Sequence, residues 1–338
     1  MGCNACIKNN EEGSMNMPEN TKMNIFQFMQ QFDKFLKDSE YEKIKEEEMN
    51  SHLPKNYSNE QLTLPSELVE KDNLYNMEPI KFKNGNIFKG KWNEGNKIEG
   101  IGKYYIKNDD IFIEGFWDNG ELKFGRIYMP NGNIYEGYIK DSKFNGKGKF
   151  ILQHAEYEGI FENDNFKNGK MVWKNGYEYE GDFNGYCLQG KGKLKGPNGD
   201  IYEGNFNDNL FNGEGKYIYK SGNLYEGEFQ YGFKKGKGKY TSNNEYIYDG
   251  IWDNDMPFGY GKYSNWDNTL VFKCLFRDGK IAEEPIYEIG SAENFNQNDF
   301  EIKPEEMKIN FKELLHLNIS QNDPTQFKLG SFPSFLME

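Results

Sequence analysis

A tripeptide that ends in glycine recurs eight times between residues 88 and 250, and it constrains the fold more than any other feature of this sequence. Successive glycines are separated by 25, 22, 22, 22, 23, 23 and 23 residues, and the residue two positions after the glycine is aromatic in seven of the eight copies. Nine to twelve residues after that glycine, six copies carry a Gly-x-Gly pair followed by lysine. A fixed period of this length indicates a repeat architecture in which each unit packs on its neighbours.

Alternation within one copy indicates β-strands. In an extended strand, Tyr135, Gly137 and Ile139 share one face, so a ring lies beside a residue without a side chain and the glycine leaves a socket. Asn-Gly and Ser-Gly pairs between the copies favour hairpin turns, so each copy is predicted to be a β-hairpin of about 22 residues. The predicted repeat core consists of Tyr135, Gly137, Tyr157, Gly159, Phe161, Tyr179, Gly181, Phe183, Tyr202, Gly204, Phe206, Tyr225, Gly227, Phe229, Tyr248, Gly250 and Trp252.

These residues resemble the MORN (membrane occupation and recognition nexus) repeat family, whose pattern is Tyr-x-Gly-x-aromatic followed by Gly-x-Gly-x-aromatic. The resemblance covers roughly residues 80–280, with local departures such as Ile113 in place of the first tyrosine. It implies a mainly β fold, an elongated antiparallel array of about eight stacked hairpins. A ninth, degenerate copy at Phe272-Lys273-Cys274 is left open.

The segments around the array have a different composition. Apolar residues at helical spacing predict an amphipathic helix over residues 22–49, and prolines around a short helical stretch, Ser66 to Asp72, predict a linker. After the array, Pro304 and two following glutamates predict a helix that caps it. The predicted organisation is a flexible leader (1–21), the helix (22–49), the linker (50–78), the array (79–280) and a C-terminal flank (281–338) with a helix at about 304–317.

The leader begins Met-Gly-Cys-Asn-Ala-Cys. Removal of Met1 would expose Gly2 for N-myristoylation, and Cys3 and Cys6 are placed for S-palmitoylation, a sequence that looks like the dual-acylation leader of Src-family kinases. One myristoyl chain binds membranes only marginally, so stable anchoring requires a second signal. We predict lipidation at Gly2, Cys3 and Cys6.

The face of the array opposite the motif rings carries the charges. Glutamates and lysines recur in separate columns, as expected for cross-strand pairs that keep a sheet face wet. Phe116, Tyr138 and Ile160 interrupt this pattern with apolar groups and form a candidate partner surface. An intramolecular helix and an external protein are both possible occupants of that surface.

Several function classes are disfavoured. The net charge of −13 argues against a nucleic-acid-binding protein, although residues 79–280 are balanced, with 29 basic and 28 acidic residues. Three dispersed histidines, four cysteines without metal spacing, and flanks too short for a catalytic domain argue against an enzyme, and we predict no cofactor or metal. No apolar run is long enough to span a membrane.

The predicted function is a non-catalytic scaffold or adaptor, anchored by acyl chains to the cytoplasmic face of a membrane: plasma membrane, cell cortex or ciliary membrane. The resemblance implies protein partners, such as cytoskeletal ones, for the array. The alternative is a structural component of an axoneme, similar to the MORN proteins of the radial spoke head, with no need of acylation. A further alternative is a phosphoinositide-binding or lipid-kinase-associated module, which would require a basic groove; only the lysines between 234 and 239 come near one.

Overall fold

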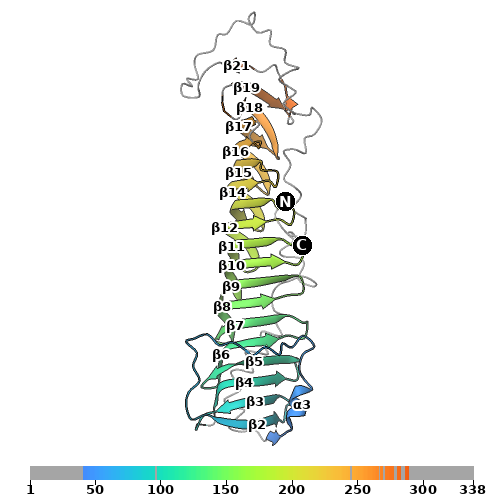
Figure 1. Ribbon diagram of the computed structural model, residues 1–338, viewed down its shortest axis with the longest axis vertical. Helices are drawn as coiled ribbons and strands as arrows, with labels where there is room; N and C mark the ends of the chain where they lie inside the picture. The colour runs from blue at the N-terminus through green and yellow to red at the C-terminus, as the bar shows by residue number, and fades with distance from the viewer. Residues whose placement is uncertain are drawn as a thin grey trace, which may run out of the picture. The chain divides into compact units, whose positions relative to one another are not determined.

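The computed structural model describes residues 41–288, apart from residues 96, 244–245, 266, 269–270, 278–279 and 283–285. The predictions for Gly2, Cys3 and Cys6 and for the helix at 304–317 lie outside the described residues. The chain divides into two compact units, Met1–Cys187 and Leu188–Glu338. The strands within each unit follow one another in chain order (Figure 1).

The first unit is an antiparallel sheet in which each strand from β2 to β11 pairs with the next, and β1 pairs with β2 at the edge. Its described elements are β1 (Tyr41–Lys43), α3 (Glu46–Asn50), β2 (Tyr75–Phe82), β3 (Ile87–Trp92), β4 (Ile98–Ile106), β5 (Ile111–Asp118), β6 (Glu121–Tyr128), β7 (Ile134–Lys140), β8 (Lys143–Ile151), β9 (Ala155–Glu162), β10 (Asn165–Trp173) and β11 (Glu178–Asn184).

The second unit is built in the same way from successive antiparallel pairs, and β20 and β21 both pair with β19. Its strands are β12 (Cys187–Lys195, at the boundary), β13 (Ile201–Asn207), β14 (Leu210–Ile218), β15 (Leu224–Gln230), β16 (Phe233–Thr241), β17 (Tyr246–Asp253), β18 (Met256–Asn265), β19 (Val271–Arg277), β20 (Lys280–Ile281) and β21 (Ile286–Glu288). The prediction of a mainly β, antiparallel hairpin array is confirmed within each unit.

The motif glycines set the register, because they face one another across the strands. Gly137 pairs with Gly148, and Gly204 pairs with Gly215. A Cβ atom on Gly204 would lie 2.5 Å from the hydroxyl of Tyr202 and 2.7 Å from the Cα of Gly215, so only glycine fits between the ring and the neighbouring strand. Cys274 stands opposite Gly261 in the glycine position, which places β19 as the first strand of the degenerate ninth copy.

The motif tyrosine closes the socket that the glycines leave. The hydroxyl of Tyr135 donates to the carbonyl of Tyr138 at 2.8 Å, and Tyr202 donates to the carbonyl of Asn205 at 2.9 Å. The register shifts beside the glycine in both hairpins, between Gly137 and Ile139 and between Gly204 and Phe206. The tyrosine therefore bridges its own strand over the glycine and bonds to the residue at the shift.

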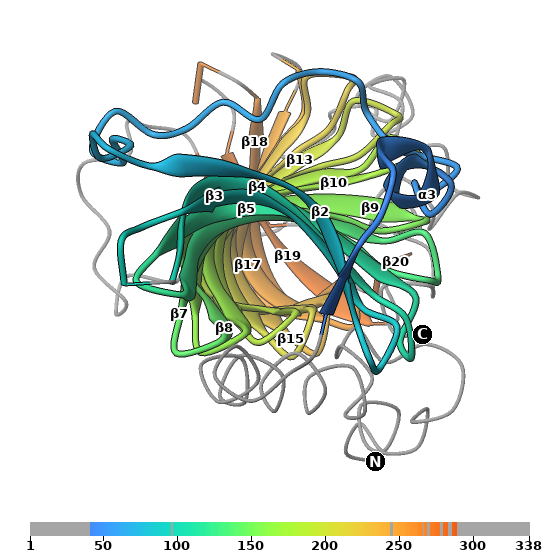
Figure 2. The same ribbon diagram turned by 90° about the horizontal axis from the view of Figure 1, so that it is seen from below.

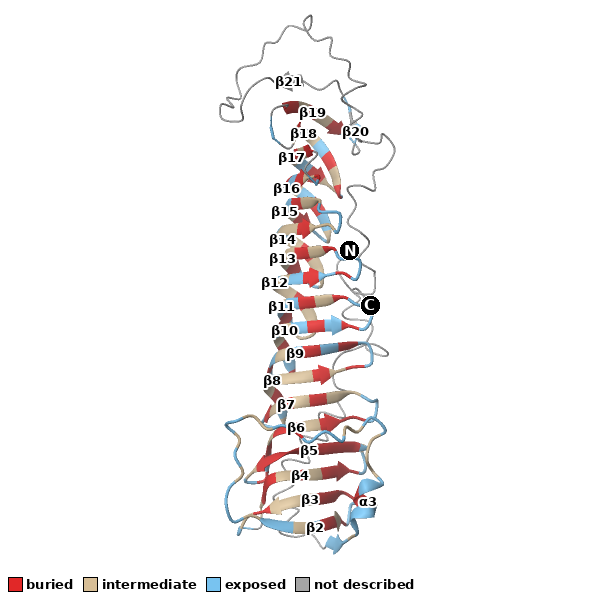
Figure 3. Cartoon of the chain, viewed as in Figure 1, coloured by how far each residue is buried: buried red, intermediate tan, exposed pale blue. Residues whose placement is uncertain are grey.

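We call the face with the motif tyrosines and glycines the inner face and the face with the charged columns the outer face. Inner-face rings pack on one another: Tyr202 stacks on Phe211 with centroids 3.7 Å apart and meets Phe229 edge-on. On the outer face, Lys193 pairs with Glu203 at 2.6 Å, which confirms the predicted cross-strand columns. Burial alternates along such strands, as Figure 3 shows for β10.

The helical N-terminal flank is not found in the described residues. Residues 41–43, predicted to continue a helix, form β1 on the edge of β2, and within residues 41–288 the only helix described is the five-residue α3 at the end of the predicted span. Pairing with β2 satisfies backbone groups that the sheet edge would otherwise expose. The free energy gained in this way outweighs the local preference for a helix. Residues 22–40 of the predicted helix lie outside the described part of the chain.

The predicted linker is a packed segment, and the helix expected at residues 66–72 is also absent. A single turn, in which the amide of Leu68 donates to the carbonyl of Pro65 at 3.0 Å, takes its place. Consecutive residues Glu70 and Lys71 both contact the sheet, whereas a helix would place successive side chains in different directions. These tertiary bonds stabilise the segment by more free energy than a one-turn helix would contribute in water.

Candidate interaction surfaces

The first unit has an outer face that its own chain covers. We call residues 44–74 the strap; it begins just before α3, contacts β3–β7 and then enters β2, and it is the blue segment of Figure 2. Met49 of the strap is buried with outer-face residues Ile87, Tyr105 and Phe112. Both faces of β5 are therefore buried, and Figure 3 shows the strand almost wholly in the buried colour.

Acidic strap residues bind outer-face lysines. Glu48 accepts from Lys81 at 2.7 Å, and Glu46 and Glu70 pair with the outer-face lysines of β3. Glu70 also accepts the backbone N–H of Ile101 at 2.8 Å. Two glutamates of the acidic run in the predicted helix, Glu46 and Glu48, thus form ion pairs with lysines of the sheet.

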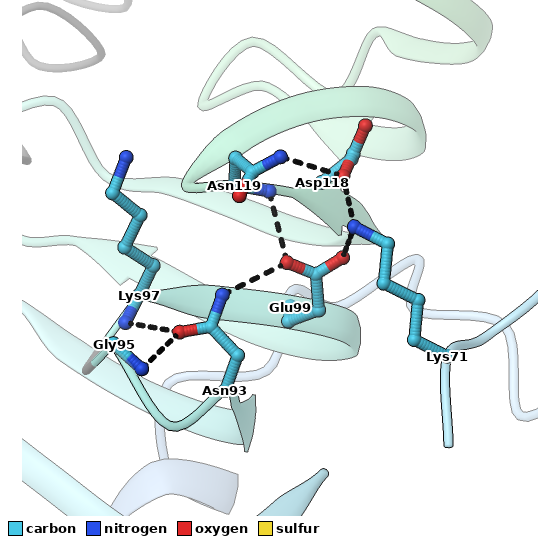
Figure 4. A network of polar contacts seen from close by, with 7 residues as sticks. All are labelled: Lys71, Asn93, Gly95, Lys97, Glu99, Asp118 and Asn119. Atoms are coloured by element: carbon cyan, nitrogen blue, oxygen red, sulfur yellow. Dashed lines mark hydrogen bonds and ion pairs between the residues drawn. The ribbon is translucent and has the colours of Figure 1, made fainter. Parts of the chain in front are cut away.

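Lys71 fastens the strap where it approaches β4 and β5 (Figure 4). Its ammonium lies 2.7 Å from both the Glu99 carboxylate and the Asp118 carboxylate. Glu99 is 1% exposed and also accepts from the side-chain amide of Asn93 and the backbone N–H of Asn119. The bond from Lys71 lowers the pKa of Asp118 below its usual value.

The three residues of the predicted partner surface differ in exposure: Phe116 is buried, Tyr138 bonds to the strap, and Ile160 is exposed. Phe116 is 5% exposed, and the hydroxyl of Tyr138 donates to the Glu67 carboxylate. Burial and this bond raise the pKa of Tyr138 to about 12. Ile160 stays 40% exposed. The occupant at Tyr138 is an irregular segment of the same chain, a possibility that the pattern alone could not separate from an external protein.

The outer face of the second unit also carries a row of apolar residues. Among the described residues, no segment covers this row as the strap covers the first unit. Ile201 pairs with Ile218, which pairs with Leu224, and all three side chains are half-buried. The same cross-strand row in the first unit is Ile87, Tyr105 and Phe112, which lies under the strap. We call Ile201, Ile218 and Leu224 the outer row.

A second exposed cluster lies at the last strands. Phe258 and Tyr260 are 50% and 58% exposed, and Ile251, opposite Phe258, is 36% exposed. Leu275 lies opposite Tyr260 and is half-buried. We call Ile251, Phe258, Tyr260 and Leu275 the terminal patch. The predicted partner surface does not include these residues, although two-residue alternation along β18 places Phe258 and Tyr260 on one face with Lys262.

One cation is buried in the inner face. Lys234 is fully buried, and its ammonium lies within 6 Å of the centroids of four rings, Tyr219, Tyr225, Tyr240 and Trp252. It donates to the Tyr219 hydroxyl at 2.5 Å. Burial lowers the pKa of Lys234 to about 7, opposed by the Asp255 carboxylate. Of the lysines between residues 234 and 239 that could form a phosphoinositide site, Lys234 is therefore buried and not accessible to a lipid headgroup.

The described residues hold no group of three or more His, Cys, Asp or Glu placed to bind a metal ion. In the same part of the chain, no helix is long and apolar enough to cross a membrane. Burial raises the pKa of the Cys274 thiol to about 11, which makes it a poor nucleophile.

Several solved structures show a distant likeness to this chain. The G-box domain of the microcephaly protein CPAP, described as suggesting a role in centriole elongation, is 10% identical over 59% of this chain and 86% of its own, with a TM-score of 0.20. The Drosophila melanogaster SAS-4 TCP domain, in complex with a proline-rich motif of Ana2, is 9% identical over 64% and 95%, also at 0.20. A streptogramin B lyase is 14% identical over 57% and 80%, at 0.14. TM-scores this low support no argument.

No curated protein matches the chain. The MORN repeat pattern matches residues 135–153, 179–201, 202–224, 225–245 and 248–267. The copies without a match begin at Phe88, Ile113 and Tyr157, and the first two lack the motif tyrosine. The chain thus carries five detected MORN repeats, a type of repeat that serves in protein or membrane interaction.

Proposed function

We propose that this protein is a non-catalytic adaptor that acyl chains on Gly2, Cys3 and Cys6 hold at the cytoplasmic face of a membrane, while the second unit binds a protein partner. The observation that carries the partner-binding part is the outer row, whose three apolar side chains are only half-buried. In the first unit the equivalent row is buried by a segment rich in apolar and acidic residues. The outer row offers the same chemistry to another chain.

The partner favoured by this surface is an apolar and acidic segment. Lysines Lys193 and Lys216 lie on the same face as the outer row, as Lys81 and Lys89 do beneath the strap. Each of the first two already pairs with a glutamate on the sheet, so apolar burial supplies most of the affinity and the charges set the orientation. A half-buried isoleucine covered by a partner would gain on the order of 1 kcal/mol.

The anchor is tested by fractionating cells that express the full chain. We expect Gly2→Ala and the double variant Cys3→Ser/Cys6→Ser to move the protein from the membrane fraction to the soluble fraction. Gly13→Ala, a glycine in the same leader, is the matched control. If both lipidation variants stay with the membrane, the acyl anchor is wrong, and the array or the segment at residues 22–49 becomes the proposed membrane element.

Partner binding is tested separately by proximity labelling with the full chain. Ile218→Glu places a charge in the outer row and is expected to remove the labelled partners, whereas Tyr231→Glu, a 68% exposed ring in a turn, should leave them unchanged. Identical labelling by wild type and Ile218→Glu would reject the outer row as the binding surface. Loss of labelling in Ile160→Glu alone would instead locate the surface on the first unit.

A further inference from the structure

The terminal patch has no part in the proposed adaptor function. Its rings stand on the outer face, where the neighbouring hairpins carry charged or polar groups. Phe258 and Tyr260 are both at least half exposed, in a unit whose other described rings are mostly buried. Exposed rings grouped on one sheet face mark a contact.

The charge around the patch has one dominant sign. The outer faces of β16–β19 carry six cations and two carboxylates among the described residues: Lys235, Lys237, Lys239, Lys262, Lys273 and Arg277 against Asp249 and Asp253. Lys273 extends over the Tyr260 ring, with its ammonium 5.1 Å from the centroid. A segment that covers these rings is therefore expected to be apolar and acidic.

The chain continues from this place with such a segment. β21 pairs with β19, and Glu288 lies opposite Val271, on the strand that contributes Leu275 to the patch. Residues 289–338 contain eight acidic and four basic residues, and Met307, Phe311, Leu314 and Leu315 recur at helical spacing among them. The 15 residues from 288 to 303 can span up to about 50 Å, so the patch is within reach.

The strap shows how this chain covers an outer face. It places the buried Met49 and the partly buried Leu53 on apolar outer-face residues and pairs its glutamates with flanking lysines. The sequence from Lys303 to Leu336 has the same combination of residues. We infer that residues 303–336 pack on the terminal patch of their own chain, with Phe311, Leu314 and Leu315 over the rings and Glu305, Glu306 and Glu313 toward the lysines.

Hydrogen exchange of the full chain tests this inference, independently of lipidation and partner binding. In the wild type we expect the amides of residues 303–317 to be protected, and in Phe258→Ser/Tyr260→Ser we expect that protection to fall by about tenfold or more. Tyr231→Ser is the matched control and should leave it unchanged. Both patch rings are exposed, so the amides of β13–β15 should exchange as in the wild type and show that the sheet is intact.

A second variant leaves the sheet untouched. Glu305→Lys/Glu306→Lys reverses the proposed charge pairing and is expected to reduce the same protection. Free exchange of residues 303–317 in the wild type, or protection that survives both double variants, would overturn the inference. Protection that disappears on dilution would identify a second copy as the occupant and would overturn it as well.

Discussion

The ammonium of Lys234 lies 5.1 Å from the centroid of the Trp252 ring, at a position of the hairpin where the preceding one places Phe211. A lysine thus stands in an aromatic stack. Tyr219, Tyr225 and Tyr240 surround it, and their rings offset part of the cost of burying a cation. Burial lowers the pKa of Lys234 to about 7, and the Asp255 carboxylate opposes that shift.

Because the pKa of Lys234 is lower in the folded chain, the free energy of unfolding should increase with pH. The folded pKa of about 7 is below the unfolded value of 10.5, so between these values the unfolded chain holds a proton that the folded chain lacks. Unfolding free energy should increase from pH 7 to pH 9 by up to about 1.4 kcal/mol per pH unit. Urea unfolding should show this slope in wild type and a smaller slope in Lys234→Met, and equal slopes would contradict the lowered pKa.

Tyr202→Phe removes a hydroxyl that donates to the carbonyl of Asn205 at 2.9 Å. We expect a loss of about 1 kcal/mol in unfolding free energy, because a part-buried acceptor loses its partner. Denaturant midpoints measure the effect. Tyr231→Phe, on an exposed ring, should change the midpoint negligibly, and a comparable loss there would show that the hydroxyl bond is not the cause.

Gly204→Ala should destabilise the protein more strongly. Its Cβ would lie 2.5 Å from the Tyr202 hydroxyl and 2.7 Å from the Cα of Gly215, and the backbone contact cannot move without opening the hairpin. We expect a loss of about 2–3 kcal/mol, measured by thermal or urea unfolding. Gly95→Ala, in a turn where the nearest contact is the side-chain oxygen of Asn93, is the control and should cost far less.

Lys71→Met should loosen the strap. The substitution leaves the buried Glu99 carboxylate without its cation, which costs on the order of 1–3 kcal/mol. Hydrogen exchange of the strap amides should accelerate, and Glu99→Gln in the same chain should restore part of the protection. Lys123→Met, which breaks an exposed pair with Glu121, should leave the strap unchanged. Unchanged strap exchange in Lys71→Met would show that apolar contacts alone hold it.

The repeat core was predictable because its determinants are local. Tyr202, Gly204 and Phe206 lie on one strand, and two-residue alternation alone puts them on one face. The paired charges of Lys193 and Glu203 follow from the same periodicity. Lys234 could have been noticed by its place in the hairpin, where other copies have Phe144, Phe166 or Phe211. Its four ring neighbours, however, come from three strands and from the residue after β14.

The repeat period by itself determined the strands, their antiparallel order and the glycine register, since each is encoded within about 22 residues. Only the tertiary structure decided that residues 44–74 cover Ile87 and Phe112 of the first unit while the rings of Phe258 and Tyr260 stay exposed. The physical reason is that local propensity for a short helix is worth little in water. Contacts between Met49 and Ile87, and between Lys71 and Glu99, join residues far apart in the chain and outweigh it.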